Sequence, residues 1–110
     1  MSFPKLYRAI AHADAVCFYD VEASQYSMIL LSLGMVLVGK RRDTLSFSDE
    51  KKTSFFYLKP IRKLKVGKRV EKITHISYKD LVEKGTEKKK ILQEMEKAFQ
   101  PYERVAFISY

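Results

Sequence analysis

The sequence has 110 residues, enough for about one small domain with a modest core. Hydrophobic residues make up 46% and charged residues 31%, a balance typical of globular proteins and not of disordered ones. The single cysteine, Cys17, excludes an internal disulfide. The N-terminal segment has no apolar core of signal-peptide type, and the longest apolar run, Met28–Val38, is far shorter than a membrane helix. We therefore expect a cytoplasmic, soluble protein with no membrane partner.

The net charge of +8 is concentrated in one part of the sequence. Between Lys40 and Lys72 there are 12 Lys and Arg residues against 4 Asp and Glu residues, whereas the two signs balance elsewhere. Such a region attracts polyanions, and nucleic acid is the obvious partner. The alternative is a solvated surface that only keeps the protein soluble. We interpret the aromatic residues of this region, Phe55 to Tyr57, as strand residues and not as platforms for stacking bases.

The first half of the sequence predicts one helix and three strands. Ser2-Phe3-Pro4 favours a helix start, and apolar residues at helical spacing continue it to about Ala13. The expected strands are Ala15–Val21, Met28–Val38 and Thr53–Leu58. We expect a turn at Glu22–Gln25 and a polar connection over Lys40–Lys52, and Pro60 ends the third strand because proline cannot donate to a ladder.

The second half predicts two helices and a last strand. The basic stretch Arg62–Lys72 has no clear period and is expected to be a loop. Ser77 and Asp80 have the spacing of a capping box, and Gly85 favours a helix stop, so a short helix is expected over about Tyr78–Lys84. An amphipathic helix over Glu87–Phe99 and a strand over Arg104–Tyr110 follow. The short connections predict an antiparallel meander of three strands, and the helical crossover returns the fourth strand parallel to one of them.

Two carboxylates, Asp20 and Glu22, follow the apolar run of the first strand. Because side chains alternate along a strand, both carboxylates face the same way while Val21 points into packing. Like charges this close repel each other unless a cation lies between them, and Mg²⁺ prefers hard oxygen ligands. The alternative is a strand that emerges into solvent with two exposed acids.

The segment Phe18-Tyr19-Asp20-Val21-Glu22-Ala23-Ser24 resembles the first motif of the DEDD-type 3′–5′ exonucleases, the superfamily that includes the proofreading subunits of bacterial DNA polymerases. Later segments match the family's order and spacing, at Ile29–Val36, Phe56–Pro60, Ile73–Leu81 and Arg104–Tyr110. The resemblance covers nearly the whole sequence. It implies an α/β fold with a ribonuclease H-like mixed sheet, a three-strand antiparallel meander plus a parallel strand.

The sequence also departs from the family pattern. The family's second and third catalytic aspartates, and its histidine or tyrosine base, come later in the domain and have no counterpart here. Gln25 replaces the glycine that often follows the first motif. Residues 1–110 are therefore expected to be the amino-terminal part of a single exonuclease-like domain, in truncated form.

The resemblance implies metal-dependent hydrolysis of phosphodiesters at a single-stranded 3′ end of DNA or RNA. Asp20 and Glu22 would be catalytic residues and ligands of Mg²⁺ or Mn²⁺, and they supply half the ligands of a two-metal site. The residues expected to contact substrate are Ala23, Ser24, His75 and Ile76. The basic stretch would neutralise the phosphates without reading sequence.

Because the base and half of the ligands are missing, we expect this chain alone to be inactive. We also expect either a homodimer through the carboxyl-terminal edge strand or an exchange of the terminal segment between two chains. The alternative is a fraying edge and a soluble monomer. Two other functions stay open on sequence alone. One is a non-catalytic nucleic-acid-binding module, and the other is a structural or interaction domain.

Overall fold

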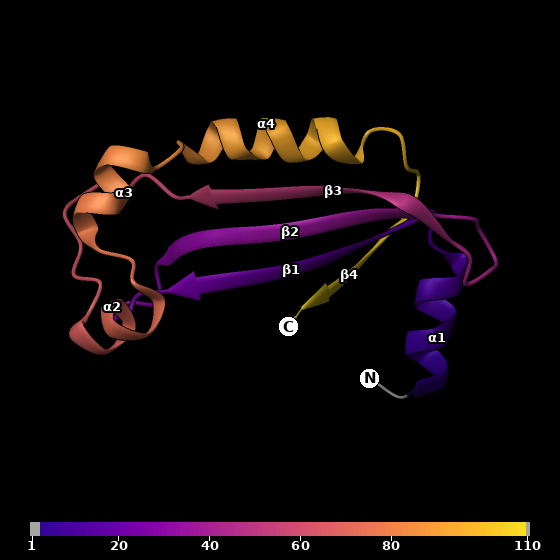
Figure 1. Cartoon of the computed structure of the whole chain (residues 1–110), viewed down its shortest axis with the longest axis horizontal. Coiled ribbons are helices and arrows are strands. Elements are labelled where there is room, and N and C mark those ends of the chain that lie inside the picture. Colours follow the sequence, from indigo (N-terminus) through magenta and orange to yellow (C-terminus); the bar gives the residue numbers. More distant parts are fainter. Residues whose placement is uncertain (1–2, 110) are drawn as a thin grey trace. The chain divides into compact units, whose positions relative to one another are not determined.

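The computed structural model describes residues 3–109, so the predicted helix start at Ser2 and strand end at Tyr110 lie outside the described residues. The helices and strands follow one another along the chain (Figure 1) as α1 (Phe3–His12), β1 (Ala15–Ala23), β2 (Leu30–Lys40), β3 (Phe47–Tyr57), α2 (Lys68–Thr74), α3 (Tyr78–Lys84), α4 (Lys88–Phe99) and β4 (Val105–Ser109).

The strands form one mixed sheet in the order β3-β2-β1-β4, with β1 to β3 antiparallel. Strand β4 returns after the helices and pairs in parallel with β1, so that Ala15 lies opposite Val105 and Tyr19 opposite Ser109. The start of β1 lies between two strands and is fully buried at Ala15, Val16 and Cys17. This confirms the predicted α/β, ribonuclease H-like mixed sheet.

The boundaries of β1, β2 and β3 differ from the prediction. Strand β1 continues through Glu22 and Ala23, and the turn comes later, at residues 25–27. Strand β2 begins and ends two residues later than expected. Strand β3 begins at Phe47 and includes residues predicted as a polar connection. Residues 47–53 of β3 are exposed, so this edge strand lacks the alternating apolar residues by which a strand is recognised in sequence.

The predicted helices α1, α3 and α4 are confirmed, and α2 is an addition. In α3, Ser77 and Asp80 form the predicted capping box, and the N–H of Gly85 bonds to the carbonyl of Leu81 at the helix end. Helix α2 lies partly in the stretch predicted as a loop. Gly67 precedes it with φ 96° and offers no side-chain cap, so the sequence carries no start signal there.

The chain divides into two compact units. The first unit comprises Met1–Tyr19, Met35–Ser54 and Glu96–Tyr110, and the second comprises Asp20–Gly34 and Phe55–Met95. In the second unit, α2 and α3 lie at the end of the sheet where β1 and β3 finish (Figure 1). Its core consists of the buried residues Leu31, Val66, Ile76 and Leu81, against which Tyr57, Leu64, Val70 and Tyr78 pack.

Two basic residues of the first unit serve its internal structure. Lys40 is 8% exposed, and its Nζ donates to the carbonyls of Ala11, Ala13 and Arg41 at 2.8, 2.8 and 2.9 Å. Arg42 donates from Nε and Nη2 to the carboxylate of Asp14 at 2.7 and 2.8 Å. These bonds hold the pKa of Asp14 well below its usual range. Lys40 and Arg42 therefore contribute less to an anion-binding surface than the sequence predicted.

Candidate functional site

The second unit contains a pocket of about 400 Å³, here called the carboxylate pocket, whose lining includes both predicted catalytic carboxylates. Its residues are Asp20, Glu22, Ser32, Gly34, Phe55, Tyr57, Ile73, Thr74 and Ile76. Asp20 is exposed and Glu22 is half-buried, so both carboxylates are open to a ligand from solvent. Val21, expected to point into packing, is 39% exposed and therefore only partly packed.

Each of three neighbouring strands contributes two residues, spaced by two, to this pocket. They are Asp20 and Glu22 from β1, Ser32 and Gly34 from β2, and Phe55 and Tyr57 from β3. Residues at this spacing lie on one face of a strand, so pairing the strands places the three pairs side by side. The end of α2 and the residues that follow it supply Ile73, Thr74 and Ile76.

The β3 pair forms an aromatic wall of the pocket. Phe55 is 58% exposed, and its ring meets that of Tyr57 edge to face, with ring centres 5.0 Å apart. A side chain at Gly34 would begin 3.6 Å from Phe55 Cδ2, so glycine there leaves the space beside the ring open. Phe55 is a strand residue, as interpreted from the sequence, but its ring is also available to a planar ligand.

Ser24, a predicted substrate contact, lies between the end of β1 and the turn at residues 25–27 and does not line the pocket. Its side chain is buried, its Oγ lies 2.7 Å from Ser27 Oγ, and it accepts a hydrogen bond from the N–H of Ile29 at 3.0 Å. The N–H of Ser24 donates to the carbonyl of Ile29. These contacts give Ser24 a structural role. The neighbouring Ala23 is half-buried at the end of β1 and is also absent from the lining.

The other two predicted substrate contacts, His75 and Ile76, differ in whether they line the carboxylate pocket. His75 follows α2 in the left-handed conformation (φ 60°), and its N–H bonds to the carbonyl of Glu71. Its side chain is exposed and does not line the pocket, whereas Ile76 is 4% exposed and does. The structure thus brings together Asp20, Glu22 and Ile76 and leaves out Ala23, Ser24 and His75. Sequence reasoning did not propose Ser32, Gly34, Phe55, Tyr57, Ile73 or Thr74.

The capacity of the pocket for a metal ion depends on its two carboxylates. Carboxylate oxygens suit Mg²⁺ and Mn²⁺, and the hydroxyls of Ser32, Thr74 and Tyr57 are the other polar side-chain groups of the lining. Within residues 3–109 there is no group of three or more His, Cys, Asp or Glu residues that could hold a metal. The donor set therefore fits a hard divalent ion that keeps several of its waters.

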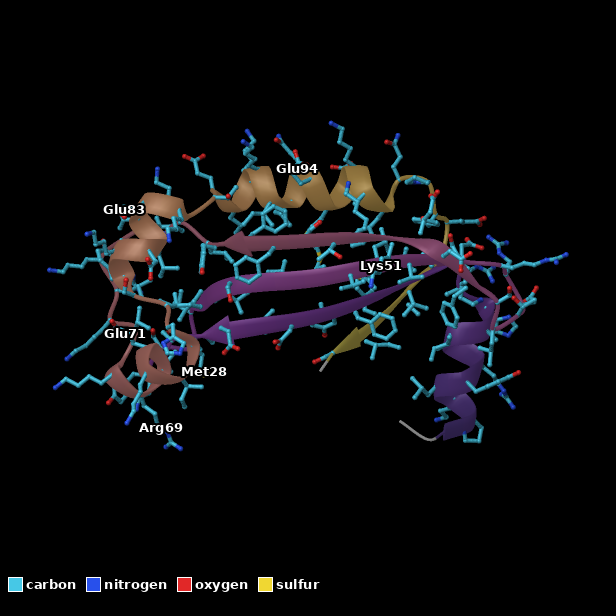
Figure 2. All side chains as sticks on the ribbon, in the orientation of Figure 1. Met28, Lys51, Arg69, Glu71, Glu83 and Glu94 are labelled. Atoms are coloured by element: carbon cyan, nitrogen blue, oxygen red, sulfur yellow. The ribbon has the colours of Figure 1, made fainter. Side chains whose placement is uncertain are left out.

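Basic residues lie on α2, which contributes to the pocket wall, and on the segment that precedes it. They form a set called here the α2 basic cluster, which consists of Lys63, Lys65, Lys68, Arg69 and Lys72. All five are exposed, and no ion pair involving them occurs in the described part of the chain. Figure 2 shows Arg69 extending outward from α2, with Glu71 on the same helix. This surface offers unpaired positive charge in the same unit as the carboxylate pocket.

No protein-family model matches the chain, and no curated protein matches it. Among solved structures, a crystal structure of a full-length 3′-exonuclease is similar with a TM-score of 0.62 and 16% identity. A structure of 3′-end specific recognition of histone mRNA stem-loop by a 3′-exonuclease gives a TM-score of 0.63 and 16% identity. Each match covers 89% of this chain but 46% of the other, so the chain spans less than half the length of these exonucleases.

None of the helices in residues 3–109 is both long and apolar enough to cross a membrane. The strand order, the parallel return of β4 and the two structural matches agree with one another. The chain has a 3′-exonuclease-like fold.

Proposed function

We propose that the carboxylate pocket is part of the active site of a DEDD-type 3′–5′ exonuclease domain, of which residues 1–110 form the amino-terminal part. The observation that carries the proposal is that Asp20 and Glu22 line one pocket, on a fold similar to that of solved 3′-exonucleases. The substrate would be the single-stranded 3′ end of an RNA or a DNA, in the cytoplasm.

In this proposal Asp20 and Glu22 hold Mg²⁺ or Mn²⁺ and are the catalytic residues that the chain supplies. A divalent ion bound there supplies Lewis-acid chemistry to a phosphodiester. The remaining ligands and the general base lie outside the set that this chain provides. Phe55 and Ile76 would accommodate the terminal nucleotide, since an exposed aromatic ring can stack on any base. The α2 basic cluster would contact the phosphates of the bound nucleic-acid strand.

The first prediction concerns the metal. Calorimetric titration of the chain with Mn²⁺ should show weak binding, with a dissociation constant on the order of 0.1–1 mM, because two carboxylates leave most of the coordination shell to water. The double variant Asp20→Asn, Glu22→Gln should lose this heat. Asp49→Asn, Glu50→Gln is the matched control, since it removes the same charge from exposed residues of β3. If both double variants bind Mn²⁺ like the parent chain, the carboxylate pocket is not the metal site.

The second prediction is that the isolated chain does not shorten an oligonucleotide labelled at its 5′ end, with Mg²⁺ or with Mn²⁺. Catalytic groups that act together lose nearly all their effect when some of them are absent, and the described residues contain no three-ligand group. Gel electrophoresis measures the products. Metal-dependent shortening that the Asp20→Asn variant abolishes would show that the chain is catalytically complete.

A non-catalytic nucleic-acid-binding module is the second candidate. It is favoured by the unpaired charges of the α2 basic cluster, which need no metal to bind phosphates. Fluorescence anisotropy of a labelled single-stranded oligonucleotide separates the two candidates. Binding that Mn²⁺ strengthens in the parent chain, but not in Asp20→Asn, Glu22→Gln, supports the exonuclease-type site. Binding that is indifferent to Mn²⁺ and to both substitutions supports the simpler module.

The third prediction concerns assembly. Strand β4 lies at the edge of the described sheet, and Phe107 on this strand is 55% exposed although it meets the rings of Tyr19 and Phe99. Apolar edge strands tend to pair with a second copy, and we expect a two-fold symmetric homodimer through β4. Light scattering at several protein concentrations should give a mass that rises from monomer to dimer. A constant monomer mass would contradict this pairing.

A further inference from the structure

A second pocket, of about 480 Å³, lies in the same unit and is called here the Pro60 pocket. It is lined by Ile29, Leu30, Leu58, Lys59, Pro60, Ile61, Arg62, Leu64 and Lys88. None of these residues lines the carboxylate pocket. The Pro60 pocket is therefore a separate feature that the proposed function leaves unexplained.

Backbone hydrogen bonds fix the floor of this pocket. The N–H of Leu58 donates to the carbonyl of Leu31, and the N–H of Lys59 donates to the carbonyl of Thr86. The N–H of Thr86 donates in turn to the carbonyl of Tyr57, which completes a short parallel bridge between the end of β3 and the segment before α4. Gly85 lies against the backbone of Lys59 so closely that no side chain fits between them. Backbone hydrogen bonds therefore hold in place the segment that leads from β3 into the pocket.

The surface of the Pro60 pocket is largely apolar and open to solvent. Ile61 is 99% exposed and Leu30 is 45% exposed, and the other apolar side chains of the lining are half-buried. A single exposed aliphatic residue needs no explanation, but a contiguous group around a concave surface marks an interaction site. A partner that inserts an apolar side chain into this pocket would remove that side chain from water and gain the full free energy of burying it.

The charges of the lining all have one sign. Lys59 and Arg62 follow β3, and Lys88 begins α4, whereas the lining contains no acidic residue. None of the three cations takes part in an ion pair within the described residues, although other lysines of this unit, such as Lys79 and Lys84, do. The pocket therefore combines an apolar floor with an unneutralised cationic rim.

We propose that the Pro60 pocket docks a peptide segment of a partner protein that presents an aliphatic or aromatic side chain between acidic residues. The aliphatic floor receives the apolar side chain, and Lys59, Arg62 and Lys88 receive carboxylates on either side of it. A peptide fits better than a fatty acid because the three cations come from two segments of the chain, residues 59–62 and the start of α4, and a peptide can present a carboxylate to each segment. This docking site does not depend on the proposed nuclease function, because it uses none of the carboxylate-pocket residues.

Peptide display against the immobilised chain provides the test. A random library is selected, and an enriched sequence is synthesised with a fluorescent label and titrated by fluorescence polarisation. The expected enriched sequences combine one or two large apolar residues with flanking Asp or Glu. Ile61→Ser should weaken binding by about tenfold or more, since burial of one aliphatic side chain is lost. Arg62→Gln should weaken it by about two- to fivefold, and added salt should weaken it further.

Two matched variants control for general effects. Val82→Ser removes an exposed aliphatic residue of α3 that lines neither pocket, and Lys89→Gln removes the exposed charge next to Lys88. Both should leave binding unchanged, and circular dichroism should show all four variants folded. Enriched sequences without acidic residues, or equal loss with Ile61→Ser and Val82→Ser, would overturn the proposal. Displacement of the peptide by laurate or by a single-stranded oligonucleotide would also overturn it, in favour of a lipid or a nucleic-acid site.

Discussion

Replacing Lys40 with methionine is expected to lower the free energy of unfolding by about 2–4 kcal/mol, because a buried ammonium that bonds three carbonyls is lost. The chain is of a size at which this corresponds to a fall in the melting temperature on the order of 10–20 °C. Thermal unfolding followed by circular dichroism measures the change. Methionine keeps the length and the apolar stem of lysine, so the charge and its hydrogen bonds are the main difference.

The size of this expected loss of stability depends on which hydrogen bonds each of the three carbonyls keeps when Lys40 is replaced. The carbonyl of Ala11 also accepts the N–H of Asp43, and that of Arg41 also accepts the hydroxyl of Thr44, so each keeps one donor. For the Ala13 carbonyl, Lys40 is the donor found within the described residues, and this hydrogen bond is buried. Ala11 lies in the last turn of α1 and Ala13 directly follows the helix, where a positive charge also compensates the helix dipole.

Lys51→Met is the matched control. Lys51 lies on the exposed part of β3 (Figure 2), and no hydrogen bond or ion pair of its side chain occurs in the described part of the chain. Its replacement should change stability by less than about 0.5 kcal/mol, as for most surface substitutions. Equal melting temperatures for the two variants would mean that Lys40 contributes no more than an ordinary surface lysine.

Lys40 also illustrates why the basic stretch could be located from sequence but not resolved into roles. Lys40, Arg42 and Lys68 have the same weight in a charge count. Tertiary contacts make Lys40 a buried hydrogen-bond donor and Arg42 the ion-pair partner of Asp14, whereas Lys68 stays exposed on α2. Those contacts join residues 27 and 28 positions apart, which no local pattern records.

Elements with local signals were predicted well. The capping box of Ser77 and Asp80 and the stop at Gly85 define α3 within the sequence itself, and the structure agrees. Helix α2 was missed because it begins at a glycine without a capping side chain. The first half of β3 was missed because its residues pair through the backbone while their polar side chains face solvent.

The residues of the candidate site also differ in whether a local sequence pattern could identify them. That Asp20 and Glu22 face the same way was predicted from the two-residue period of a strand, and in the structure both line one pocket. The aromatic wall depends on the register in which β3 pairs with β2, which brings Phe55 beside Gly34. Register is set by the whole sheet, so neither residue could be assigned to the pocket from its own neighbours in sequence.

Neutralising the α2 basic cluster is expected to reduce the affinity for single-stranded nucleic acid by at least about tenfold at 0.1 M salt. Each phosphate contacted by a cation contributes about 0.7 to the slope of log affinity against log salt concentration for single strands. If three of the five cations contact phosphates, changing all five to glutamine should make the slope shallower by about two. The five substitutions are Lys63→Gln, Lys65→Gln, Lys68→Gln, Arg69→Gln and Lys72→Gln.

A second fivefold variant tests whether position or total charge matters. It changes exposed lysines of α3 and α4 to glutamine and lowers the net charge equally, at Lys79, Lys84, Lys89, Lys90 and Lys97. Anisotropy titrations of the parent chain and both variants, with one labelled oligonucleotide over a range of salt concentrations, give the affinities and slopes. We expect the oligonucleotide to bind along α2, which shares its unit with the carboxylate pocket. In that case the variant of α3 and α4 should keep nearly the parental slope of log affinity against log salt concentration. Equal losses in both variants would mean that only the net charge of +8 attracts nucleic acid, and that the α2 basic cluster is not a binding surface.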